Sequence, residues 1–169
     1  MKLFKALIIC LILSLPSAVQ AQTKFGHVNT QTLLEAMPAV TKLRQHLDSM
    51  QTQYATMIKD LDAKLQKLVA EASTPEARNW SDLKKNDKRK EIEQLNDRVQ
   101  GLQQDAQNEI QAETELKFKP INDLVKKAIA DVAKEGKFTY IFDASSPNML
   151  YFDGGEDILP LVKKKLNLK

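Results

Sequence analysis

Cysteine and glycine are scarce in this 169-residue chain, and each scarcity narrows the classes of protein to which it can belong. The single cysteine, Cys10, falls in an N-terminal leader described below, so no disulfide can hold the rest of the chain together. Only five glycines occur, and the apolar residues are spaced apart by lysine, glutamine and acidic residues. This composition favours long helices over a compact globule.

A strong excess of either charge is also missing. The formal net charge of +3 falls to +1 once Lys2 and Lys5 leave with the leader. The overall balance therefore indicates neither nucleic acid nor an anionic membrane as a partner, and only local clusters can argue for one. No second long apolar run follows the leader, which predicts a protein that is soluble after export.

Residues 1–21 are predicted to form a secretory signal peptide that is cleaved after Ala21. Lys2 and Lys5 supply its basic start, residues 6–15 form an apolar core too short to span a membrane, and small residues occupy the cleavage positions. The alternative is a lipoprotein signal around Cys10. It is disfavoured because two isoleucines precede that cysteine where small residues are expected.

Two long helical seams dominate the middle of the chain. The first helix is predicted over 38–72, with Pro38 tolerated in its first turn. The chain then breaks at 73–76, where Thr74 is a good helix N-cap, and a second seam returns. We therefore predict an antiparallel, coiled-coil-like arm about 50 Å long with its tip near 73–76. The apolar seam positions are Val40, Leu43, Leu47, Met50, Tyr54, Met57, Leu61, Leu65 and Leu68 on the first helix, and Leu83, Ile92, Leu95, Val99, Leu102, Ala106 and Ile110 on the second.

The N-terminal part of the mature chain is predicted to hold a short strand and a short helix. Residues 24–29 alternate like a strand, and Asn29 or Thr30 can cap a helix that stops before Pro38.

The C-terminal part is predicted to form a hairpin and a last helix. The returning helix passes through Pro120, where a kink is expected, and ends at Gly136. Strands over 138–143 and 150–152 are then expected to pair around a Ser-Pro-Asn turn, with three aromatic residues on one face. Asp157 is the predicted N-cap of the last helix.

These few strands and a two-helix arm leave strand edges and aromatic side chains uncovered within one chain. We therefore expect the strands to pair with strands of other copies, since closed symmetric assembly removes free edges. The residues expected in this assembling body are Phe25, Val28, Phe138, Tyr140 and Phe142.

At its two ends the chain resembles the Skp/OmpH-like periplasmic chaperones. The matching stretches are KFGHVNTQTLLEAMP at 24–38 and FTYIFDASSPNMLYFDGGEDILPLVKKKL at 138–166. The resemblance implies a homotrimer shaped like a jellyfish, with an intersubunit β-barrel body built from 22–37 and 120–169 and a hairpin arm from 38–119. It also implies a non-enzymatic, ATP-independent holdase in the periplasm, without cofactors, that encloses unfolded outer-membrane β-barrel proteins. The alternative is an adaptor that docks on an envelope complex through its hairpin tip.

Two groups of arm residues are candidates for contacts with partners. Adaptable side chains for apolar clients are Met50, Tyr54, Met57 and Trp80, for which packing between the helices is the simpler interpretation. The basic cluster near the tip contains Lys84, Lys85, Lys88 and Arg89. It is interpreted first as a solvated helix face, with contact to lipopolysaccharide or an anionic membrane surface as the alternative.

Catalytic and metal sites are not indicated. His27 and His46 lack a neighbouring grouping of acid and nucleophile, and no glycine-rich phosphate loop occurs. Asp153, Glu156 and Asp157 do not follow the spacing of a calcium loop, and a turn with an N-cap explains them.

Overall fold

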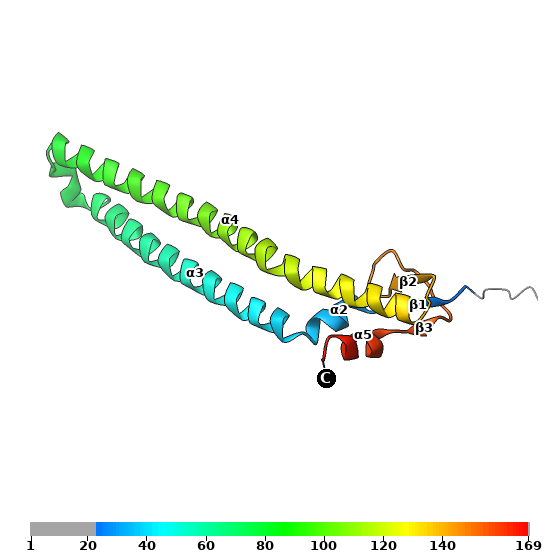
Figure 1. Ribbon diagram of the computed structural model, residues 1–169. Helices are drawn as coiled ribbons and strands as arrows, with labels where there is room; N and C mark the ends of the chain where they lie inside the picture. The colour runs from blue at the N-terminus through cyan, green and yellow to red at the C-terminus, as the bar shows by residue number, and fades with distance from the viewer. Residues whose placement is uncertain (1–22, 169) are drawn as a thin grey trace, which may run out of the picture.

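The computed structural model describes residues 23–168, which form a long two-helix arm that projects from a small body of strands and short helices (Figure 1). The signal peptide predicted over 1–21 and its cleavage site lie outside these residues. The prediction of a mostly helical chain with a small β body is confirmed. No helix within 23–168 carries an apolar stretch long enough to cross a bilayer.

The arm consists of α3 (Pro38–Ala72) and α4 (Asp82–Glu135), which run side by side along its length (Figure 1). The predicted bounds of the first helix are confirmed: Pro38 stands in its first turn, and Ser73 ends it. In α4, Pro120 lies inside the helix and Gly136 follows its last residue, as predicted.

The tip differs from the sequence prediction. Thr74 is an N-cap, since its side chain accepts a hydrogen bond from the Ala77 amide, but the helix it starts is a short 3-10 turn, η1 (Pro75–Asn79). The returning helix α4 begins only after Ser81, whose hydroxyl accepts from the Lys84 amide. The tip therefore spans 73–81 instead of 73–76, because two N-caps follow one another and the second starts the long helix.

Two short helices complete the body. Asn29 caps α2 (Thr30–Glu35), with its side-chain oxygen 2.8 Å from the Thr32 amide. The last helix, α5 (Leu159–Lys165), has Pro160 in its first turn. The Asp157 carboxylate accepts from the Leu159 amide at 2.9 Å, although the residue at the cap position is Ile158.

The sheet corrects the predicted hairpin. It contains β1 (Phe25–Val28), β2 (Tyr140–Asp143) and β3 (Glu156–Asp157) in the order β2-β1-β3, with both outer strands parallel to β1. Residues 150–152 form no strand. Within residues 23–168 the strands therefore pair with one another. Pairing with strands of other copies stays a prediction.

The path of the chain between β2 and β3 explains this difference. The carboxylate of Asp143 accepts from the Ser145 amide at 2.9 Å and from the Ser145 hydroxyl at 2.6 Å, which turns the chain out of the sheet. Gly154 and Gly155 have φ angles of 106° and 85°, a region that favours glycine, and they return the chain beside β1 at Glu156. A crossover of this length permits parallel pairing, whereas a tight hairpin would impose antiparallel pairing.

The hydrophobic core lies where the arm meets the body. Leu33 of α2 and Ile158 before α5 are fully buried there, and Val40 and Leu43 of α3 belong to the same cluster. The first turns of α3 therefore pack as part of the body, although they were predicted as arm. The buried members of the cluster are Val28, Leu33, Met37, Val40, Leu43, Ile121, Val125, Ala128, Val132, Ile158 and Val162.

Candidate functional site

Polar contacts between side chains fix how the two arm helices align. His46 Nε2 lies 2.9 Å from Glu113 Oε1, the Tyr54 hydroxyl donates to Glu109, and Lys88 Nζ lies 3.4 Å from Glu71 near the tip. In each pair one residue comes from α3 and the other from α4. Residues of the two helices whose numbers add up to about 160 are therefore neighbours, as antiparallel packing requires.

These contacts shift the ionisation of side chains on the arm, among them Glu113 and Tyr54. Hydrogen bonds from Lys117 and then from His46 hold the pKa of Glu113 below its usual range. The hydrogen bond to Glu109 raises the pKa of Tyr54. Both shifts favour the protonation states in which the two helices are linked.

The four candidate client contacts have different surroundings. Met50 is half-buried on the seam, and Tyr54 is half-buried and bound to Glu109. Trp80 is half-buried at the tip, where Lys84 Nζ lies 4.3 Å from the centre of its ring. The side chain of Met57 is 51% exposed, so among these four it is the most open to a partner.

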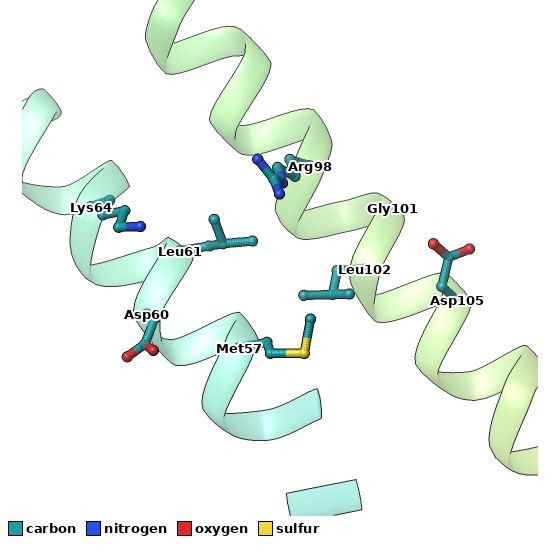
Figure 2. A pocket seen from close by; sticks show the side chains of 8 residues that line it. All are labelled: Met57, Asp60, Leu61, Lys64, Arg98, Gly101, Leu102 and Asp105. Atoms are coloured by element: carbon teal, nitrogen blue, oxygen red, sulfur yellow. The ribbon is translucent and has the colours of Figure 1, made fainter. Parts of the chain in front are cut away.

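Met57 borders a groove between the helices that the sequence analysis did not anticipate. Figure 2 shows Met57 and Leu61 of α3 reaching toward Leu102 of α4, beside Gly101. The groove has a volume of about 430 Å³. A Cβ atom placed on Gly101 would meet nothing within 4 Å, so this stretch of the seam is open. A glycine inside a long helix is the sequence signal that could have drawn attention to it.

The basic cluster at the tip is largely engaged with its own chain. Lys84 lies over Trp80, Lys85 Nζ donates to the Arg78 carbonyl at 3.0 Å, and Lys88 bridges Glu71 and Glu91. Hydrogen bonds to Glu91 and Glu71 raise the pKa of Lys88. Arg89 forms no ion pair with another residue of 23–168. These contacts favour the interpretation of the cluster as a structural helix face.

The sheet presents an uncovered aromatic face. Phe25, Tyr140 and Phe142 remain 45%, 58% and 44% exposed, and their ring centres lie 6.0–6.3 Å apart. The parallel register places Phe25 beside Tyr140, and His27 beside Phe142. A cluster of exposed aromatic side chains is typical of a surface that another protein covers.

Two residues predicted in the assembling body, Val28 and Phe138, do not lie on this face. Val28 is buried in the core of its own chain, because alternate residues of β1 point to opposite sides of the sheet. Phe138 precedes β2 and packs against the core, and it contacts Gly26 and Gly136 under the ammonium group of Lys24. The prediction that Phe138 shares a face with Tyr140 and Phe142 was therefore wrong.

The crossover between β2 and β3 adds apolar side chains next to this face. The ring of Phe152 lies 4.8 Å from that of His27, and Tyr151 and Met149 line the same hollow of about 300 Å³. Leu150 is almost fully exposed. The hairpin predicted over 138–152 gave no sign that the apolar side chains of this segment are left open.

Asp143 connects β2 to the start of α2. Its carboxylate accepts from the hydroxyl of Thr30 at 2.6 Å and from the Thr30 amide at 3.2 Å, in addition to its bonds with Ser145. Burial raises the pKa of Asp143, but the hydrogen bonds from Ser145 and Thr30 outweigh that effect and hold it below the usual range. The ionised carboxylate therefore stabilises the body.

Comparisons with known proteins agree with the family resemblance. The family model for outer membrane protein (OmpH-like) matches residues 24–166. An uncharacterised protein of Aquifex aeolicus is 30% identical over 156 residues, which cover 92% of this chain and 93% of that protein. The chaperone proteins Skp of Yersinia enterocolitica and Pectobacterium atrosepticum are each 28% identical over 160 residues, with the same coverage.

Proposed function

Because the chain belongs to the OmpH-like outer membrane protein family, we propose that it is a periplasmic holdase chaperone that keeps unfolded outer-membrane β-barrel proteins from aggregating. Similarity to the two Skp chaperones over nearly the whole chain supports this proposal. The protein acts without ATP and without a cofactor, and it is not an enzyme.

The arm is the observation that carries the proposal. Beyond its base, the apolar seam between α3 and α4 is mostly half-buried, and Met57, Val69 and Leu116 keep large exposed fractions. The 35 residues of α3 extend over about 50 Å, which is longer than a small domain is wide. A long surface with many partly open apolar side chains suits many weak contacts with an unfolded chain better than one tight site.

Unfolded β-barrel proteins match such a surface. Their strands alternate apolar and polar residues, and the apolar ones face lipid only after insertion. In water these residues aggregate unless another surface covers them. Weak, distributed contacts also allow release without nucleotide hydrolysis. A protein that is exported across the inner membrane and cleaved after Ala21 would need this, because it has no nucleotide to use.

The body is proposed to form a homotrimer in which other copies cover the aromatic face. Both outer strands of the sheet, β2 and β3, have one edge without a partner among residues 23–168. Parallel sheets are usually covered on both faces, and here one face bears exposed Phe25, Tyr140 and Phe142. A ring of copies would join the edges into an intersubunit barrel and point three arms in one direction, around a client.

The alternative is an adaptor that docks on an envelope complex through the hairpin tip. Trp80 would be its anchor, yet Lys84 covers one side of that ring and the side chain is half-buried. Contact of the tip with lipopolysaccharide or an anionic membrane is likewise a weaker proposal, since Lys84, Lys85 and Lys88 already have partners in the chain.

An aggregation assay tests the proposal. An outer-membrane β-barrel protein is diluted from urea, and light scattering is followed with and without the mature protein. We expect suppression at about one trimer per client in the absence of ATP. No suppression, together with capture of one envelope partner through the tip, would support the adaptor instead. Light scattering of the chaperone alone checks the assembly, and a folded monomer at micromolar concentration would contradict the trimer.

A further inference from the structure

The groove beside Gly101 is not needed for the packing of the arm. Glycine is the least favourable ordinary residue inside a helix after proline, and it is kept where a larger residue would clash. At Gly101 nothing lies within 4 Å of an added Cβ, so no neighbour demands a glycine. Its effect is to leave the groove open above half-buried Leu61 and Leu102 and exposed Met57 (Figure 2).

Four charged residues surround this apolar floor, and their signs are separated along the arm. Asp60 and Asp105 lie toward the body, whereas Lys64 and Arg98 lie toward the tip (Figure 2). None of the four forms an ion pair with another residue of 23–168. Charges that frame an apolar surface without pairing are available to a ligand whose own charges have the opposite order.

The groove continues toward the tip. A second hollow of about 440 Å³ shares Lys64 and Arg98 with the first and has Leu68 and Leu95 in its floor. From Met57 to Leu68 the helix rises about 17 Å, which is the length of about five residues of an extended strand. The two hollows together therefore match a short extended segment in length.

We propose that this groove binds an extended segment of an unfolded polypeptide. An aromatic or large aliphatic side chain of the segment fills the space over Gly101, against Met57, Leu61 and Leu102. A basic side chain at the end of the segment toward the body faces Asp60 and Asp105. An acidic side chain about two residues further along faces Lys64 and Arg98, where the two hollows meet. The inference rests on the proposed holdase function and assigns one place on the arm where a client is held.

A packing flaw and a contact between copies of the chain would each give a different result at this hollow. If the hollow is only a packing flaw, filling it stabilises the arm and leaves client binding unchanged. If it receives the arm of another copy, filling it changes the mass of the assembly and not its affinity for peptide.

The experiment uses the whole mature protein, labelled with ¹³C at its methionine methyl groups. The probe is a peptide of about five residues in which phenylalanine and tyrosine alternate with polar residues, with lysine at the end next to the phenylalanine and glutamate between the two aromatic residues. We expect the Met57 methyl signal to shift on titration, while the signals of buried Met37 and of Met149 in the body stay in place. A probe with serine in place of the phenylalanine should leave Met57 unshifted.

Gly101→Leu places a side chain in the hollow, and Gln103→Leu is the matched control, because it adds the same side chain on an exposed position of α4. Gly101→Leu should weaken peptide binding about ten-fold or more, and Gln103→Leu should leave it unchanged. The inference is overturned if the Met149 signal moves instead of Met57, if both variants bind like the wild type, or if Gly101→Leu changes only the mass of the assembly.

The aggregation assay on the same three proteins separates this inference from the proposed function. Suppression by wild type and by Gly101→Leu alike would leave the holdase in place and remove the groove as its client site. Peptide binding at Met57 without suppression by the wild type would keep the groove as a peptide site and contradict the holdase.

Discussion

The body and the arm of this molecule use the same kinds of residues but bury them to very different degrees. In the body, Leu33, Ile158 and Val162 are completely buried in a cluster to which β1, α2, α3, α4 and α5 all contribute. Along the arm beyond Leu47, apolar residues of α3 are at best half-buried, and Val99 and Ala106 are the buried positions of the facing stretch of α4. A seam between only two helices cannot enclose a side chain on all sides.

This difference separates stability from function. The free energy of folding is concentrated in the body, because burial of apolar area is its main source. The arm keeps apolar side chains partly open, which costs stability and leaves them free to contact another chain. Regions that bind are commonly drawn from the less stable part of a protein.

The largest expected effect lies in the core of the body. Leu33→Ala removes a side chain with no exposed surface and leaves a cavity, so we expect a loss of about 2–5 kcal/mol in the free energy of unfolding. Urea unfolding followed by circular dichroism measures it. Leu83→Ala is the control, since Leu83 is 73% exposed and should lose little. Equal losses at both positions would remove the distinction between body and arm.

A charge in the arm seam should act locally. Leu95→Asp places a carboxylate among half-buried side chains, at a cost of about 2–3 kcal/mol, and should let the outer arm fray. Hydrogen exchange should show faster exchange in 60–100 and unchanged protection in the body. Asn96→Asp adds the same charge on the exposed neighbour and should change nothing. Loss of protection in arm and body together would show that they unfold as one unit.

The contact of Asp143 with Thr30 makes the body sensitive to acid. Because the folded pKa lies below the unfolded value of about 3.9, the carboxylate stabilises the fold above that pH, and the gain is lost as pH falls through the folded pKa. Asp143→Asn should cost roughly 1–3 kcal/mol at pH 7. Its difference from the wild type should shrink as pH falls below about 4 in urea titrations. A difference that stays constant with pH would assign the loss to geometry alone.

The smallest expected effect has the opposite sign. Gly101→Ala should stabilise the arm by about 0.5–1 kcal/mol, since alanine is the better helix former and the space is open. Slower hydrogen exchange around 95–107, with no change in the body, is the measurement. A destabilised arm would mean that the backbone at Gly101 needs a conformation that alanine cannot adopt.

Local signals in the sequence predicted the helices well. Pro38 and Ser73 mark the two ends of α3, Asn29 caps α2, and Gly136 follows α4, because each of these positions depends on neighbouring residues only. The signal at Thr74 was read correctly as an N-cap but attributed to the wrong helix, since nothing local distinguishes one 3-10 turn from the start of a long helix.

Pairing over long distances was not readable from the sequence. Phe25 and Tyr140 are neighbours in the sheet but more than a hundred positions apart, and the strand pattern at 138–143 and 150–152 suited a hairpin equally well. The groove at Gly101 was missed for a similar reason. The apolar positions of each helix were read along that helix alone. Such a reading cannot show which side chains of α3 lie beside the space that Gly101 leaves on α4.

The central claim is that the arm, and not the body, holds the client. A symmetric truncation must follow the observed alignment of the helices, in which Glu71 pairs with Lys88 and His46 with Glu113. Residues 62–98 are therefore replaced by a short flexible turn. Light scattering then compares this variant with the full-length protein during dilution of an unfolded outer-membrane β-barrel protein. The account predicts that the shortened protein assembles like the wild type and loses most of the protection against aggregation. Equal protection by the shortened protein would contradict it.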